Sequence, residues 1–198
     1  MTYKEHIALW TTHAEKKFSD FDANLTQHEG VSVLDWRNKN GSGVYYMRVI
    51  FDEDKERMFI SGDLGNAVFQ FTEKATLFRI ARYSSFSYFM EKLSCSTNRW
   101  EYDRQSAREE LEERLKSEDM SESELEEADE LIGDIMDNYD QYGNGTHLTE
   151  DLTDRISDID PDYWEWVYSL GELPHPRVII WWQALKLAAR QIEEISAG

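Results

Sequence analysis

Residues 44–71 read VYYMRVIFDEDKERMFISGDLGNAVFQF, and this stretch decides the fold of the first half of the chain. Its apolar runs are rich in β-branched and aromatic residues, and the turn-forming sequences at 52–55 and 63–66 separate them. Such runs predict short strands joined by tight turns. Together with Val31 and Val33, which precede the turn at 40–43, they predict a small antiparallel sheet of about four strands.

Helical periodicity surrounds this sheet. An N-terminal helix with Ile7, Trp10, Ala14 and Phe18 on one side comes first, and two short helices follow the strands. From Glu101 onward the pattern predicts helices alone, at 102–116, 122–139, 149–156, from Asp160-Pro161 onward, and 176–195. The expected fold class is therefore α+β: an α+β sheet domain over 1–100 and an acidic helical domain over 101–198, which could also pack as one unit.

The charge lies almost entirely in the second half. The 198 residues include 21 Lys and Arg against 40 Asp and Glu, a net charge of −19. Residues 1–100 hold 13 acidic and 13 basic side chains, so residues 101–198 carry the whole excess. A field of this sign repels phosphates and anionic lipids, so we expect a basic protein partner and neither direct nucleic acid binding nor membrane binding.

The apolar stretches of the chain predict neither a leader nor an anchor. The first residues lack the apolar core of a signal peptide, and Val178–Trp182 is too short to span a bilayer. We therefore expect a cytoplasmic protein in a bacterial host. Cys95 is the single cysteine, so an internal disulfide and a cysteine-based metal site are excluded, and no cofactor is expected.

The helix at 122–139 carries the strongest functional signal. Glu126, Glu130, Asp134 and Asp137 follow one another at i, i+4, i+8 and i+11, opposite the apolar stripe, with Glu127 beside them. A solvated helix face is the ordinary explanation of such a run. However, the preceding helix pairs its acids with bases at i+4, whereas the sequence has no Lys or Arg between 116 and 155. This difference indicates that the negative field is itself used.

A second acidic row follows in the sequence. Carboxylates four residues apart on a helix stand about 6 Å apart, whereas one DNA strand presents a charge every ~3.4 Å. One helix alone is thus too sparse to imitate nucleic acid. Trp164 and Trp166 lie two apart on the same segment, so a single core cannot take both from one helix, and an exposed Trp is a typical binding anchor. The predicted second set comprises Asp158, Asp160, Asp162, Glu165, Trp164 and Trp166.

Two metal-based alternatives stay open. The twelve residues Asp140 to Asp151 resemble a calcium loop, but Tyr142, His147 and Asp151 depart from the pattern at positions 3, 8 and 12, which favours an acidic Gly-rich turn. Clustered carboxylates would also suit a Mg²⁺-dependent nuclease. No basic residue near them in the sequence would hold a substrate phosphate, so this alternative is the weaker one.

Three segments carry a family resemblance. Residues 58–69 (MFISGDLGNAVF), 87–93 (SYFMEKL) and 175–178 (HPRV) resemble a group of uncharacterised proteins carried by bacteriophages, prophages and plasmids. The resemblance spans most of the chain and assigns no catalytic residue. Some acidic proteins of this size from such elements are anti-CRISPR inhibitors, which implies an anti-defence role by context.

The leading hypothesis is therefore an anti-CRISPR inhibitor with a surface that mimics nucleic acid. Its partner would be the basic guide-RNA or DNA channel of a type II CRISPR effector nuclease, because such channels hold phosphates with Lys and Arg. One alternative is a metal-dependent hydrolase that cleaves the guide RNA or induces its cleavage. Another is a phage structural or accessory protein with no effect on any nuclease.

Overall fold

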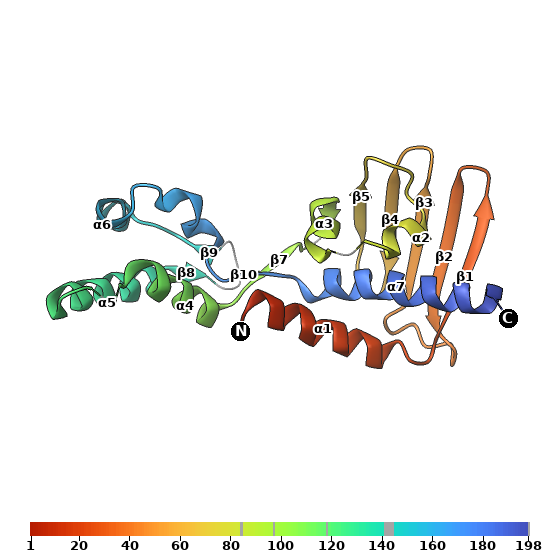
Figure 1. The fold of residues 1–198 in the computed structure, drawn as a ribbon, viewed down its shortest axis with the longest axis horizontal. Helices are drawn as coiled ribbons and strands as arrows, with labels where there is room; N and C mark the ends of the chain where they lie inside the picture. Colours follow the sequence, from red (N-terminus) through yellow and green to blue (C-terminus); the bar gives the residue numbers. More distant parts are fainter. Residues whose placement is uncertain (84, 97, 118, 141–144, 198) are drawn as a thin grey trace. The chain divides into compact units, whose positions relative to one another are not determined.

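The computed structural model describes residues 1–83, 85–96, 98–117, 119–140 and 145–197. The chain forms two compact units (Figure 1). Unit 1 comprises residues 1–6 and 100–174, and unit 2 comprises residues 7–99 and 175–198. Helix α1 (Tyr3–Lys17) begins in unit 1 and continues into unit 2.

Unit 2 contains an antiparallel sheet of six strands in the order β1-β2-β3-β4-β5-β6. The strands are β1 (Phe21–His28), β2 (Val31–Asn38), β3 (Met47–Asp52), β4 (Arg57–Gly62), β5 (Ala67–Gln70) and β6 (Leu93–Ser96). The prediction of about four strands is thus wrong, because β1 and β6 extend the sheet. β1 interleaves its apolar residues with polar ones, and β6 has only four residues, so neither stands out in the sequence.

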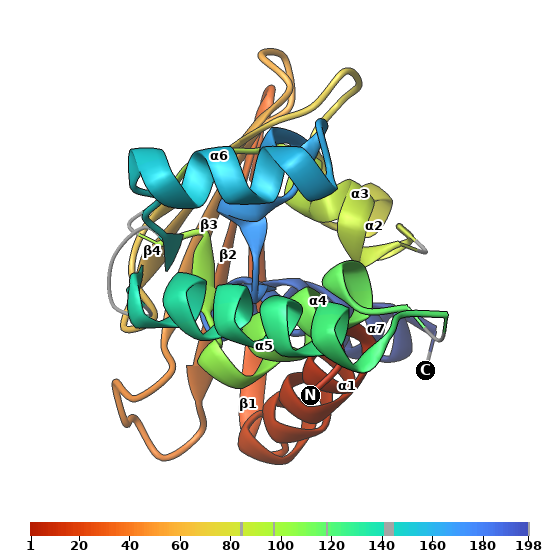
Figure 2. The same cartoon turned by 90° about the vertical axis from the view of Figure 1, so that its left-hand side faces the viewer.

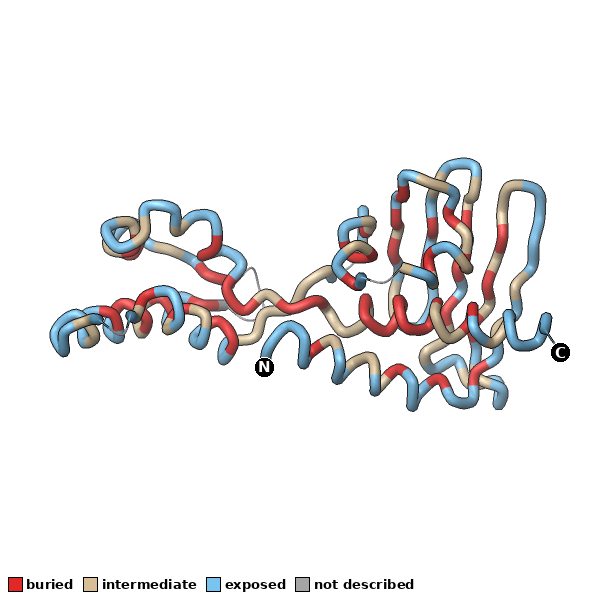
Figure 3. The backbone as a smooth tube through the Cα atoms, viewed as in Figure 1, coloured by how far each residue is buried: buried red, intermediate tan, exposed pale blue. Residues whose placement is uncertain are grey.

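One face of this sheet forms the core of unit 2. Leu34, Val49 and Phe69 are fully buried on it, and their neighbours along each strand are more exposed, as the alternating colours in Figure 3 show. The ring of Phe18, just after α1, lies 5.6 Å from Trp36, and Phe89 of α3 (Phe86–Glu91) lies 4.6 Å from Phe69. Helices therefore cover one face and leave the other open.

Helix α7 (Pro176–Ala197) is the central helix of unit 2. Every residue from 178 to 185 is buried, and α7 packs against β1 and against α2 (Leu77–Ala81). Ile195, which the apolar stripe placed inward, is instead 71% exposed in the last turn of the helix.

Unit 1 is mainly helical, but the expectation of an all-helical second half is wrong. Its helices are α4 (Arg104–Leu115), α5 (Glu122–Asp137) and α6 (Glu150–Ile159), and the 3-10 turns η1 (Tyr163–Glu165) and η2 (Val167–Ser169) follow. Strand β7 (Trp100–Tyr102) pairs with β10 (Glu172–Pro174), and β8 (Tyr139–Asp140) pairs with β9 (Gly145–Thr146). Ladders of two or three residues have no readable period, which is why helical reasoning missed them.

Local capping chemistry fixes the helix starts in unit 1. Asp103 caps α4, and Thr149 caps α6 as the sequence predicts. Ser121 and Glu124 form a capping box at the start of α5, in which each side chain bonds the other residue's backbone N–H. The helices are thereby held at defined starting points around a shared core.

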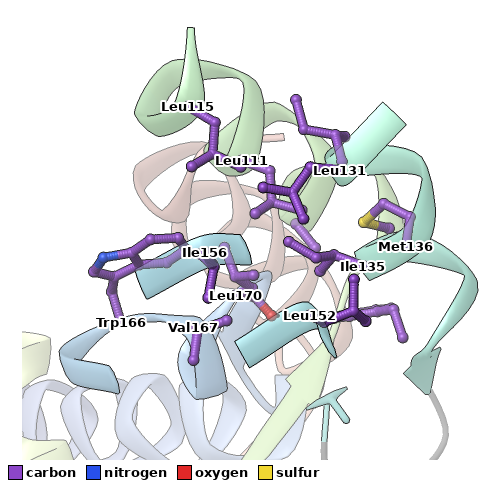
Figure 4. Packing of buried hydrophobic residues seen from close by; sticks show 13 residues of the cluster. Leu111, Leu115, Leu131, Ile135, Met136, Leu152, Ile156, Trp166, Val167 and Leu170 are labelled. Carbon is purple, nitrogen blue, oxygen red and sulfur yellow. Dashed lines mark hydrogen bonds between the residues drawn. The ribbon is translucent and has the colours of Figure 1, made fainter. Parts of the chain in front are cut away.

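A single apolar cluster joins the three helices and the 3-10 turns (Figure 4). Leu111, Ile132, Ile135 and Ile156 contribute to it and are each 0% exposed. At the edge of the cluster, Gly171 has φ +64° and lies against the backbone of Asp103, whose oxygen would collide with any side chain at position 171.

Within the described residues, no helix is both long enough and apolar enough to cross a membrane.

Candidate interaction surface

Helices α5 and α6 both belong to unit 1, and Figure 2 shows them running nearly parallel to each other. They contact each other, and residues of both line a groove. The groove has a volume of about 570 Å³, and Leu115, the last residue of α4, and Met120 also line it. We call it the α5–α6 groove. Its lining residues are Leu115, Met120, Glu124, Glu127, Ala128, Glu130, Leu131, Arg155, Asp158 and Ile159.

The groove combines an apolar floor with an acidic rim. Leu115, Ala128 and Leu131 are almost fully buried and belong to the floor. Four carboxylates stand around them, three from α5 and one from α6, and all four residues are exposed. A site of this kind fits a partner segment that offers both aliphatic and cationic groups, such as the stem and head of Arg or Lys.

The α5 residues predicted from the sequence divide into two groups. Glu126, Glu127 and Glu130 are exposed, and the part of the chain that the structure describes gives them no ion pair within 4.0 Å. Asp134 bonds Arg155 at 2.6 Å, and Asp137 lies 4.0 Å from Arg104. The tertiary fold thus neutralises the C-terminal half of the row and leaves its first half charged.

Cations from other helices, absent from the local sequence, supply this neutralisation. Arg155 also lies 3.8 Å from Asp151, and Lys116 bonds Asp129 at 2.6 Å. The hydrogen bond to Asp134, above all, raises the pKa of the Arg155 guanidinium. Arg155 therefore stays charged and fixes the α6 side of the groove against α5.

The second predicted set is less uniform. Asp158 lies on the groove rim, and Asp162 and Glu165 are exposed. Asp160 has a structural role: its carboxylate accepts the N–H of Asp162 at 2.9 Å and the indole N–H of Trp166 at 2.8 Å. Asp160 thereby ties the end of α6 to the 3-10 turns and is not an outward charge.

The two tryptophans have opposite environments. Trp166 is 8% exposed, and the guanidinium carbon of Arg114 lies 4.7 Å from its ring centroid. Trp164 is 59% exposed on η1. The segment forms 3-10 turns and not the α-helix expected from Asp160-Pro161, so the reasoning from two positions on one helix does not apply to it. One of the two tryptophans is nevertheless exposed.

Several groove residues escaped the sequence reasoning. Glu124 is not among the residues predicted from the sequence. It lies exposed on the rim, and hydrogen bonds from Ser121 lower its pKa, which favours the ionised carboxylate. Ile159, 49% exposed, ends α6 beside Asp158. In the sequence, the only sign of this surface is that an apolar residue, Ile159, stands between the acidic residues Asp158 and Asp160.

The division of charge between the units is sharper than the division between sequence halves. Unit 1 holds six Lys and Arg against 26 Asp and Glu, a net charge of −20. Unit 2 holds 15 Lys and Arg against 14 Asp and Glu, a net charge of +1. Unit 1 is therefore the source of the negative field, and unit 2 has almost no net charge.

The segment from Asp140 to Asp151, which resembles a calcium loop, lies partly outside the residues that the structure describes. Residues 141–144 of the loop from Asp140 to Asp151 are not described, and the loop's last two residues form the first turn of α6. Among the residues that are described, no group of three or more His, Cys, Asp or Glu side chains is arranged to hold a metal ion.

Comparison of the chain with protein families, with curated proteins and with solved structures found no match.

Proposed function

We propose that this protein is an inhibitory binding protein whose unit 1 occupies a cationic nucleic-acid channel of a bacterial nuclease. The observation that carries the proposal is the α5–α6 groove, with its apolar floor and a rim of four exposed carboxylates. A net charge of −20 on unit 1 would steer it toward basic surfaces and speed encounter with them.

A type II CRISPR effector is the expected target. Its guide and target strands lie in a positively charged channel, so an acidic protein competes with nucleic acid for the same side chains. The groove adds what a plain acidic surface lacks, because a Lys or Arg of the channel wall finds both a carboxylate for its charge and an apolar floor for its stem. The inhibitor would thus block guide RNA or DNA loading by occupancy.

The test uses purified effector, guide RNA and labelled target DNA. Added protein should displace the DNA, as measured by fluorescence anisotropy, and the displacement should weaken at high salt. The triple variant Glu127→Lys/Glu130→Lys/Asp158→Lys should lose at least about tenfold in apparent affinity, mainly through slower association.

A matched control separates the groove from net charge. Asp20, Glu29 and Glu194 are exposed acids of unit 2, and changing all three to Lys alters the total charge by the same amount. This variant should inhibit almost as well as the native chain. Equal loss in both triple variants would show that only bulk charge acts, and absence of inhibition by the native chain would refute the proposal.

The same mixture distinguishes the enzymatic alternative. Guide RNA recovered after incubation with Mg²⁺ or with EDTA is analysed on a denaturing gel. Intact RNA with lost DNA binding supports occupancy, whereas shortening that depends on Mg²⁺ would favour a hydrolase. If the chain neither displaces DNA nor shortens RNA, a structural or accessory role becomes the better hypothesis.

A further inference from the structure

The open face of the sheet in unit 2 carries a continuous apolar row. Strand pairing places Val33 opposite Ile50, Ile50 opposite Phe59, and Phe59 opposite Val68. Cys95 of β6 continues the row beside Val68. Directly opposed residues of an antiparallel sheet share a face, so these five side chains run across β2 to β6 in one line, which we call the apolar row.

The row is accessible. Ile50 is 38% and Phe59 36% exposed, and Cys95 is exposed at the end of the row. A hollow of about 440 Å³ lies over Phe59, Val68 and Cys95. Polar side chains usually occupy the solvent face of an antiparallel sheet, and a contiguous apolar strip on such a face is typical of an interaction site.

We propose that this row is the interface through which two copies of the chain associate, sheet against sheet. Unit 2 has a net charge of only +1, so two such faces meet with little mutual repulsion. An acidic or a basic partner would gain no electrostatic attraction from this unit, whereas a second copy brings an equally apolar row.

Opposite charges flank the row on its two sides, so that two copies related by a two-fold axis can bring them together. Along β3, Arg48 and Asp52 lie on either side of Ile50 and on the same face, because side chains alternate along a strand. A two-fold axis along the row places β3 over β3 of the second copy in the opposite direction. Arg48 lies 3.5 Å from Asp35 of its own chain but keeps 48% of its side chain exposed. In the dimer, Arg48 of each copy also faces Asp52 of the other, which gives two equivalent contacts between opposite charges around an apolar centre.

The size of the face predicts a weak dimer. Five spacings of about 4.8 Å give the six strands a width of roughly 24 Å, and aligned sheets pack about 10 Å apart. The apolar row crosses only four of these spacings with one side chain per strand, so the contact is small. Buried area alone does not fix affinity, and we expect a weak dimer with a dissociation constant on the order of 10 µM.

The experiment measures self-association by analytical ultracentrifugation over a concentration series, at about 0.3 M salt to screen repulsion between the acidic units. The native chain should dimerise, and Ile50→Thr/Phe59→Thr should weaken the dimer about tenfold or more while keeping strand propensity. Leu9→Thr, which changes an apolar residue of α1 that is 54% exposed, is the matched control and should leave the dimer intact.

Charge reversal tests the orientation. Arg48→Glu should weaken the dimer, because it places a carboxylate opposite Asp52 of the second copy. Cys95 should also face Cys95 of the second copy, so a short bismaleimide should join two native chains and fail to join Cys95→Ser. Circular dichroism verifies that each variant is folded.

Two results would overturn the proposed dimer. A native chain that stays monomeric at about 100 µM, well above the expected dissociation constant, overturns the proposal. So does a dimer that is unaffected by Ile50→Thr/Phe59→Thr. These outcomes are independent of the α5–α6 groove, whose residues belong to unit 1.

Discussion

The guanidinium of Arg155 lies 2.6 Å from the carboxylate of Asp134 and joins α6 to α5. Both side chains are partly exposed, at 33% and 44%, so the pair resembles a surface ion pair more than a buried one. The pair connects the two helices that line the groove, beside the apolar cluster that packs between them.

Replacing Arg155 by Met should lower the free energy of unfolding by about 1 kcal/mol at low ionic strength, and less at high salt. The reason is that Asp134 and Asp151 lose their shared cation. Urea unfolding at two salt concentrations measures the effect. Arg108→Met, which removes an i, i+4 pair with Glu112 on α4, is the control and should cost about 0.5 kcal/mol or less. An equal cost for both would contradict the bridging role.

The two tryptophans should differ strongly in stability. Trp166→Ala removes a buried ring and the hydrogen bond to Asp160, and we expect a loss of about 3–5 kcal/mol. Trp164→Ala should change stability by less than about 0.5 kcal/mol, because that ring is exposed. Chemical denaturation followed by circular dichroism tests both. Comparable losses would show that Trp164 is packed in solution.

Acid should destabilise unit 1 through the cap of α4. Hydrogen bonds from the Ser106 side chain and backbone lower the pKa of Asp103 from 3.8. A carboxyl whose pKa is lower in the folded state contributes stability above its unfolded value, and this stability is lost as the pH falls through the folded value. Asp103→Ala should therefore cost about 1 kcal/mol at pH 7 and much less near pH 2. A cost that is independent of pH would contradict this account.

Gln191 should protect the outer edge of the sheet. Its side-chain oxygen accepts the N–H of Ala23 at 2.6 Å, and its amide donates to the carbonyl of Phe21 at 3.0 Å, so it replaces a neighbouring strand. Gln191→Ala should cost about 1–2 kcal/mol and speed hydrogen exchange at the Ala23 amide. Glu194→Ala, an exposed change on the same helix, is the control. Unchanged exchange at Ala23 would mean that the edge is protected in another way.

Much of the local structure could be predicted because its causes are local. The start of α6 at Thr149 and the apolar stripe of α5 follow from capping and from helical period. Strands β3 to β5 follow from apolar runs between turns. In contrast, β7 and β10 pair across 70 residues from Tyr102 to Glu172, and no window of sequence contains both strands.

The candidate site shows the same limit. The acidic row on α5 is evident from spacing, but its partial neutralisation depends on Arg155, 21 residues beyond Asp134. Likewise, burial of Trp166 and exposure of Trp164 depend on 3-10 turns that the helical interpretation did not predict.

The sequence by itself determined the amount of negative charge, its restriction to one region and the amphipathic faces, because composition and periodicity are properties of short segments. Only the tertiary structure decided which carboxylates are ion-paired, which apolar side chains form the floor of the groove, and that five residues from five strands align in the apolar row. The physical reason is that ion pairing and burial act between atoms that are close in space, and folding alone brings distant segments within that range.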